Sequence, residues 1–309
     1  MIRQNFNADW TVEKGDGNSR MNSFLGNTQT KTVHLPYDAM IHEARTPDTK
    51  NGAQTGFYPG GEYIFQKHFT APQAWQGKPV SLVFEGVYQT ALVYLNGWLL
   101  TRNVNGYAEF TVEAGPYLKY GADNLLKVIA DNSLEPNSRW YTGSGIYRPV
   151  RLLVGNKVYL PQDTVRITTR EADEGFALLD VTAQVQSAST VTERVTLQQT
   201  ICREGTAVLT DRQNLLLQPG ESRTVSFRYC VDSPALWSPE NPNLYTSTMQ
   251  VLEGEEELDR EETSFGIRTL SIDAAHGVRI NGQTVKLRGA CIHHDNGILG
   301  AATLPDAEE

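Results

Sequence analysis

Short alternations of apolar and polar residues run through the first half of the chain, and turn-forming residues separate them. This period of two is typical of β-strands, and no long stretch shows the 3.6-residue period of an amphipathic helix. The strongest turn signal is Asn96-Gly97, which predicts a tight hairpin. The predicted strands of this half cover residues 31–36, 62–69, 80–84, 90–95, 98–100, 124–131 and 149–154. Many short strands between turns indicate a sandwich or jelly roll, which we place at residues 1–157.

The middle of the chain has a more regular alternation, with one face of each segment apolar and the other polar. Such alternation predicts antiparallel strands that face a core on one side and water on the other. The segments cover residues 164–169, 177–185, 193–201, 223–229 and 244–252. We therefore predict an immunoglobulin-like sandwich over residues 158–268, with a role in spacing and docking rather than in chemistry.

Near its end the chain carries a stretch, residues 286–295, that is apolar and small and then closes with His293, His294 and Asp295. In an extended strand Leu287, Cys291, His293 and Asp295 share one face. A buried strand whose tip presents His and Asp is typical of parallel barrels, which carry their active sites there. An isolated first strand exposes its backbone and apolar faces, so we expect residues 287–295 to be disordered or to borrow a pairing partner.

The amino-acid composition argues against two kinds of partner, nucleic acid and the membrane. The formal net charge is −9 and no basic run occurs, so we predict no nucleic-acid binding. No apolar stretch approaches the length of a membrane span, and the N-terminal residues lack the apolar centre of a signal peptide.

The cysteines are few and odd in number, which favours a reducing compartment and a cytoplasmic location. Cys202 and Cys230 have the spacing for a disulfide across a small β-domain, but we favour two buried thiols that pack as small hydrophobes.

A series of motifs in the first half resembles the N-terminal sugar-binding domain of family 2 glycoside hydrolases, a family that includes β-galactosidases and β-glucuronidases. Each motif is weak alone, and their shared order makes the resemblance strong. They are Phe84-Glu-Gly-Val-Tyr, Val93-Tyr-Leu-Asn-Gly, Asn105-Gly-Tyr, Leu118-Lys-Tyr-Gly, Asn124-Leu-Leu-Lys-Val and, most specific, Asn137-Ser-Arg-Trp-Tyr-Thr-Gly-Ser-Gly-Ile-Tyr-Arg148.

The resemblance extends to the later segments. Residues 236–245 resemble the passage before the last strands of the family's immunoglobulin-like domain, and residues 287–295 resemble the first strand of its (β/α)8 barrel. The resemblance implies an all-β chain with a jelly-roll sugar-binding domain and an immunoglobulin-like sandwich. Residues 269–309 then form a linker hairpin and the start of a truncated barrel. The ending His293-His294-Asp295 resembles the β-galactosidase branch, whereas β-glucuronidases more often have His-Glu-Asp.

The resemblance also implies a substrate site. His293 and Asp295 are expected to line the subsite of the reacting sugar through hydrogen bonds, with His294 as a further candidate. The loop with Arg139, Trp140 and Tyr141 is expected to reach into the same pocket. Aromatic faces pack on the C–H faces of sugars, and an arginine can fork onto hydroxyls or a carboxylate.

Structural roles remain open for these residues. Trp140 and Tyr141 can equally plug a domain interface, and Arg139, where relatives often carry Asp, can pair with an acidic neighbour. His293 can cap its strand. The loop of Gly56, Phe57 and Tyr58 offers a possible subsite, but we favour a turn that covers the sandwich.

The chemistry of the family requires two carboxyls about 5–5.5 Å apart. In the family both are glutamates on later barrel strands and one follows an asparagine, yet no Asn-Glu pair occurs in residues 1–309. We therefore predict no catalytic residue within residues 1–309, and we favour hydrogen bonding over metal binding at the strand tip, with neither metal nor cofactor.

The expected function is the non-catalytic N-terminal part of a retaining β-glycosidase, inactive alone. A β-galactosidase acting on terminal β-D-galactosides comes first. The alternatives are a β-glucuronidase, another family 2 glycosidase such as one acting on mannosides, or a stand-alone carbohydrate-binding module. The expected partner is a carbohydrate, and a homo-oligomer of the full-length enzyme is left open.

Overall fold

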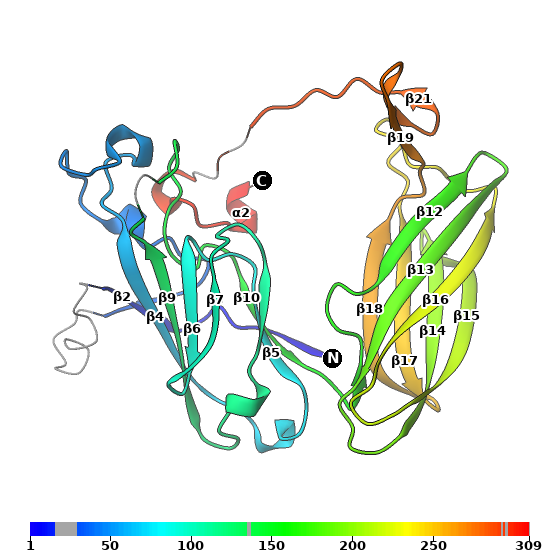
Figure 1. Cartoon of the computed structure of the whole chain (residues 1–309), viewed down its shortest axis with the longest axis horizontal. Coiled ribbons are helices and arrows are strands. Elements are labelled where there is room, and N and C mark those ends of the chain that lie inside the picture. Colours follow the sequence, from blue (N-terminus) through cyan, green and yellow to red (C-terminus); the bar gives the residue numbers. More distant parts are fainter. Residues whose placement is uncertain (16–29, 135–136, 292, 294–295, 309) are drawn as a thin grey trace. The chain divides into compact units, whose positions relative to one another are not determined.

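The computed structural model describes residues 1–15, 30–134, 137–291, 293 and 296–308 (Figure 1). The chain forms two compact units. The first unit comprises Ile2–Val154 together with Cys291–Glu309, and the second comprises Met1 and Gly155–Ala290. The segment predicted as residues 269–309 is therefore divided between the two units.

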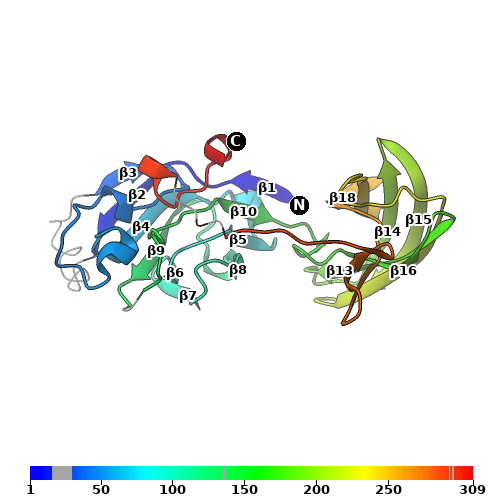
Figure 2. The same cartoon turned by 90° about the horizontal axis from the view of Figure 1, so that it is seen from above.

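The first unit is a sandwich of two antiparallel sheets (Figure 2). One sheet has the order β1 (Ile2–Asn5), β10 (Val150–Val154), β5 (Val80–Phe84) and β8 (Phe110–Glu113). The other has the order β3 (Lys31–Val33), β2 (Trp10–Lys14), β4 (Gly61–Thr70), β9 (Asp123–Asn132), β6 (Thr90–Leu95) and β7 (Trp98–Asn103). The predicted β-sandwich is confirmed.

Alternating burial explains why these segments form strands. Along β9 every second side chain is buried, and Leu126 and Val128 meet Leu82 and Leu152 of the facing sheet in one core. The Asn96-Gly97 turn joins β6 to β7 with positive φ at both residues, 52° and 90°, as a type I′ hairpin requires.

The second unit is also a sandwich. One sheet contains β11 (Val158–Tyr159), β13 (Phe176–Ser187) and β12 (Arg166–Ala172), and β16 (Ser222–Asp232) pairs with β13. The other has the order β15 (Thr206–Leu217), β14 (Glu193–Arg203), β17 (Tyr245–Glu253) and β18 (Glu256–Phe265). This arrangement fits the immunoglobulin-like architecture that the sequence predicts.

A small three-stranded sheet follows in the second unit, with β19 (Leu270–Asp273), β20 (Gly277–Ile280) and β21 (Gln283–Thr284). In the part of the chain that the structure describes, helical structure occurs only as short turns. They are η1 (Met40–His42), η2 (Gly52–Thr55), η3 (Gln73–Trp75), η4 (Gly115–Tyr117), η5 (Gly297–Leu299) and α2 (Pro305–Glu308). Within the described residues, no helix has the length and apolar character needed to cross a membrane.

The structure corrects the prediction for Cys202 and Cys230, and it shows part of the segment that was predicted to begin a barrel. Cys202 is half-buried and Cys230 is exposed, both with free thiols, so the prediction of two buried thiols is wrong. Cys230 lies on the solvent face of β16, between buried Tyr229 and Val231.

Residues 285–291 form no strand in the described chain, and Leu287 is 70% exposed, as expected for a first strand without a partner.

A cross-strand ion cluster on the second unit predicts a pH effect. Asp180 of β13 accepts hydrogen bonds from Arg228 Nε at 2.7 Å and Arg170 Nε at 2.5 Å. The bond from Arg228, and then that from Arg170, lowers the Asp180 pKa from 3.8 to about 2. Since the folded-state pKa lies below the unfolded one, this carboxylate stabilises the fold above about pH 4, and the contribution is lost between about pH 4 and pH 2.

We expect an NMR titration of the Asp180 carboxyl carbon to give a midpoint near 2. In the double variant Arg228→Gln with Arg170→Gln, the midpoint should return toward its ordinary value, because both donors are gone. A midpoint near 4 in the unaltered protein would contradict the ion cluster.

Candidate functional site

One buried carboxylate joins three segments of the first unit. Asp38 is 1% exposed. Its Oδ1 accepts hydrogen bonds from the backbone N–H of Met40 at 3.0 Å and of Ser144 at 2.9 Å. Its Oδ2 accepts from Tyr141 Oη at 2.6 Å and from the N–H of Ala301 at 2.9 Å. These four bonds attach both the loop of residues 141–144 and the end of the chain to η1.

The backbone around this carboxylate leaves no room for side chains. Gly143 has φ of 66°, and a Cβ there would lie 2.5 Å from Asp38 Oδ2. Gly300 has φ of 60°, and its Cβ would also collide with Asp38. Glycine therefore serves two needs at both positions, the left-handed backbone and the close approach to the carboxylate.

Tyr141 is held as a hydrogen-bond donor by its surroundings. Burial, together with the charge and hydrogen bond of Asp38, raises the pKa of the Tyr141 phenol far above its usual value. The phenol therefore stays protonated and donates to Asp38. Its ring also meets the ring of Tyr58 edge-on, with centroids 5.6 Å apart. These contacts fix the Tyr141 ring on the surface of the first unit.

The last described residues return to the same unit. The N–H of Thr303 donates to the Tyr147 carbonyl at 2.9 Å, and Asn296 closes a turn by donating to the Gly300 carbonyl at 2.8 Å. Ala301 packs with Tyr88 and Tyr147 in a small apolar cluster. This docking brings His293 to the loop that carries Trp140.

One pocket lies where these segments meet, and we call it the Trp140 pocket. Its volume is about 280 Å³. The rings of Trp140 and His293 stack with centroids 4.5 Å apart and an interplanar angle of 28°. The described residues that line it are Tyr107, Trp140, Tyr141, Thr142, Tyr147, Arg148, His293 and Ala301.

The Trp140 pocket thus brings together three residues that the sequence singles out, Trp140, Tyr141 and His293. Arg139 is exposed and lines neither pocket. His294 and Asp295 lie outside the described residues. The substrate-binding roles assigned to all six stay predictions.

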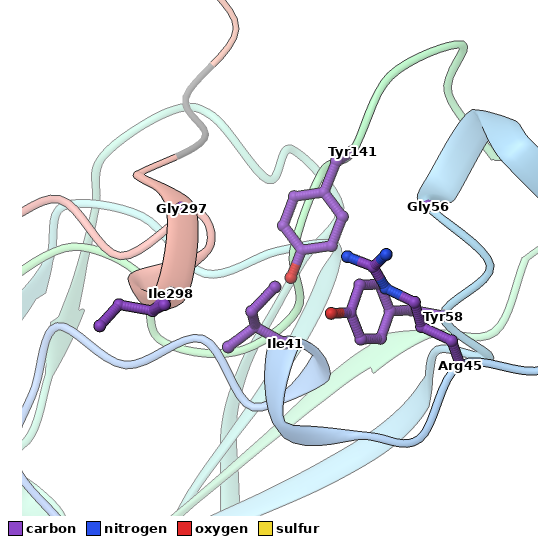
Figure 3. A pocket seen from close by; sticks show the side chains of 7 residues that line it. All are labelled: Ile41, Arg45, Gly56, Tyr58, Tyr141, Gly297 and Ile298. Carbon is purple, nitrogen blue, oxygen red and sulfur yellow. The ribbon is translucent and has the colours of Figure 1, made fainter.

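Another pocket, which we call the Arg45 pocket, also has Tyr141 in its lining (Figure 3). Its volume is about 520 Å³, and the described residues that line it are Ile41, Arg45, Gly56, Tyr58, Tyr141, Gly297 and Ile298. Tyr58 is 9% exposed and belongs to the sandwich core, as the predicted covering turn requires, yet it also lines this pocket.

Sequence reasoning missed Asp38, Arg45 and Ile41. Asp38 follows a short strand without any motif of its own, and its partners Tyr141 and Ala301 lie 103 and 263 residues away. In the sequence, Asp38 looks like an ordinary cap because it lies two positions before a short helical turn. Nothing in the sequence marks it as the residue that joins three segments.

Neither pocket has an acidic residue among its described lining. Asp38 is covered and already accepts four hydrogen bonds, so it is not placed to act as a general acid or a nucleophile. Among the described residues no group of three or more His, Cys, Asp or Glu side chains could hold a metal ion. What the pockets offer is aromatic surface and cationic donors, which suit binding.

Comparison with known proteins gives the class. Residues 158–268 match the model of glycosyl hydrolases family 2, and residues 10–177 match the model described as glycosyl hydrolase 2 galactose-binding domain-like. The chain therefore belongs to glycoside hydrolase family 2, as its motifs predict. It corresponds to the N-terminal region of a family 2 β-glycosidase.

The relatives of this chain are named for two activities, β-galactosidase and β-glucuronidase. β-Galactosidase BoGH2A of Bacteroides ovatus is 35% identical over 97% of the chain and 35% of its own length. A β-glucuronidase of Formosa agariphila is 27% identical over 98% of the chain and 33% of its own length. The chain thus spans about a third of these relatives.

Solved structures of family 2 proteins superpose well on this chain. A family 2 member from Bacteroides cellulosilyticus superposes with a TM-score of 0.90 at 32% identity, covering 100% of this chain and 40% of that one. Bacteroides uniformis β-glucuronidase 2, covalently bound to a cyclophellitol-6-carboxylate aziridine, superposes with a TM-score of 0.86 at 25% identity, covering 99% and 37%.

The Asp38 network predicts a stability effect. Tyr141→Phe removes one of the four donors and leaves a buried carboxylate oxygen with a single partner, so the free energy of unfolding of the first unit should fall by about 1–3 kcal/mol. Urea denaturation measures the change. Tyr117→Phe, at a surface ring that is 38% exposed, is the matched control and should shift it by less than about 0.5 kcal/mol. Equal effects of the two variants would rule out the network.

Proposed function

We propose that residues 1–309 are the non-catalytic N-terminal part of a retaining β-glycosidase that hydrolyses terminal β-D-galactosides. The observation that carries this proposal is the stack of Trp140 on His293. It joins Trp140, in the loop of residues 138–141, to His293, and the family resemblance assigns sugar contacts to both segments.

Galactose is the preferred sugar on two grounds. The strand tip reads His293-His294-Asp295, which resembles the β-galactosidase branch, and β-galactosidase BoGH2A is 35% identical to this chain. Relatives named as β-glucuronidases also match. A glucuronide is therefore the alternative substrate within the same enzyme class.

In the proposed enzyme the Trp140 pocket supplies a wall of the sugar site. The half-buried indole packs on the C–H face of the sugar, and His293 and Asp295 hydrogen-bond its hydroxyls. His294, Arg139 and Tyr141 adjoin these residues in the sequence and are further candidates for sugar binding. Residues 1–309 hold and orient the sugar, and the two glutamates of the family's reaction come from elsewhere in the enzyme.

The purified 309-residue protein, prepared from a host without β-galactosidase, should not hydrolyse an aryl β-galactoside above the rate in buffer. The reason is that neither pocket presents the pair of carboxyls that the retaining reaction needs. Release of the aryl alcohol, followed by absorbance, is the measurement. Turnover by this protein would overturn the non-catalytic assignment.

In an enzyme that contains these residues, Trp140→Ala should lower kcat/KM for an aryl β-galactoside by about tenfold or more, since about 1.4 kcal/mol of stacking corresponds to a factor of ten. Trp98→Ala is the matched control, because Trp98 is 65% exposed on β7 and lines neither pocket. Steady-state kinetics with both variants make the comparison, and an unchanged Trp140→Ala enzyme would count against the proposed sugar contact.

A further inference from the structure

The Arg45 pocket has the size and the lining of a ligand site. Its volume of about 520 Å³ falls in the range of small-molecule pockets, which are mostly apolar with a few polar groups. Ile41 from η1 and Ile298 from η5 supply aliphatic surface, and Tyr58 and Tyr141 supply ring surface (Figure 3). The one charged side chain in the lining is Arg45.

The Arg45 guanidinium is oriented by the ring of Tyr58, with its central carbon 5.0 Å from the ring centroid. This contact places the guanidinium at the ring, and its N–H groups can donate to a ligand. Within the described part of the chain no carboxylate forms an ion pair with Arg45. Its cation therefore lies in the pocket without a counter-charge from these residues.

The nearest acidic residue in sequence is already engaged. Glu43 bonds the Lys14 ammonium at 2.5 Å through Oε2 and accepts from Tyr63 Oη at 3.2 Å through Oε1. Asp38 is covered by its four donors. Arg45 is exposed, its guanidinium lies against the Tyr58 ring, and no described carboxylate pairs with it, so it is available to bind an external anion.

Part of the pocket wall is fixed in advance, although the Ile298 side chain is 88% exposed. Tyr141 is held by its bond to Asp38, and Gly297 and Ile298 lie in the turn that Ala301 ties to the same carboxylate. A ligand therefore meets a partly formed pocket, which lowers the cost of binding.

We propose that the Arg45 pocket binds the anionic substituent, a carboxylate or a sulfate ester, of a galactose-type sugar. The guanidinium edge forks onto two oxygens of the anion, and the tyrosine rings and isoleucines contact the sugar ring. The galactose part of this inference rests on the proposed function and on the galactose-binding-like model that residues 10–177 match. The anionic part rests on Arg45 alone.

The test is a calorimetric titration of the 309-residue protein at low ionic strength with galactose 6-sulfate, galacturonic acid, galactose and sodium sulfate. The better anionic sugar should bind at least tenfold more tightly than galactose and than inorganic sulfate. The comparison of the two acids identifies which anion fits. Raising the salt concentration should weaken the binding, because the ion pair is exposed to solvent.

Arg45→Gln should abolish the preference for the anionic sugar, and Arg45→Lys should retain part of it, since lysine keeps the charge but not the fork. Arg102→Gln is the matched control, because Arg102 is an exposed arginine of β7 that lines neither pocket. It should leave every affinity unchanged. Urea denaturation of Arg45→Gln should give the unaltered stability, which separates loss of binding from loss of fold.

Three results would overturn the inference: equal affinity for galactose and both acidic sugars, inorganic sulfate binding as tightly as the acidic sugars, or an anion preference that survives Arg45→Gln. Failure here is separable from failure of the proposed function. An enzyme containing these residues that hydrolyses neutral β-galactosides, while the chain shows no anion preference, refutes the Arg45 site alone. An anion preference without any hydrolysis by that enzyme refutes the proposed reaction alone.

Discussion

The first unit depends on one buried carboxylate. Removing a charge from water costs several kcal/mol, and only well-placed donors offset it. Asp38 has four such donors, three from backbone N–H groups and one from Tyr141. Because these donors come from three segments, the same bonds that make the charge tolerable also determine where the loop and the end of the chain lie. Both pockets share Tyr141, and their walls follow from this network.

The two pockets offer groups that suit binding rather than catalysis. The Trp140 pocket and the Arg45 pocket offer aromatic rings, aliphatic surface and cations, and no acidic residue lines either one in the described chain. Glycosidases of the retaining type need two carboxyls in addition. Fixed ring surfaces and cations of this kind suit the binding of a ligand, and the chain belongs to a family whose members are hydrolases.

Local patterns predicted much of the fold because strands depend on neighbours in sequence. Alternation located β9 and four long strands of the second unit, β13, β14, β16 and β17, but it did not locate β15 or β18. Asn96-Gly97 located a hairpin whose backbone dihedrals match. The same alternation puts Cys230 on the polar face of β16, opposite the buried Tyr229 and Val231, so the prediction of a buried thiol followed the general habit of cysteine and neglected the local pattern. Motifs singled out Trp140 and His293, and the structure places their rings in contact. Asp38 and Arg45 escaped notice because their roles come from partners or rings that only the folded chain brings near.

A crystal structure of an enzyme that contains these residues, with a galactosyl group trapped covalently in its active site, would show whether Trp140 and His293 contact the sugar. The account predicts that the sugar lies in van der Waals contact with the Trp140 ring and within hydrogen-bond distance of His293. A sugar bound with neither residue in contact would contradict it.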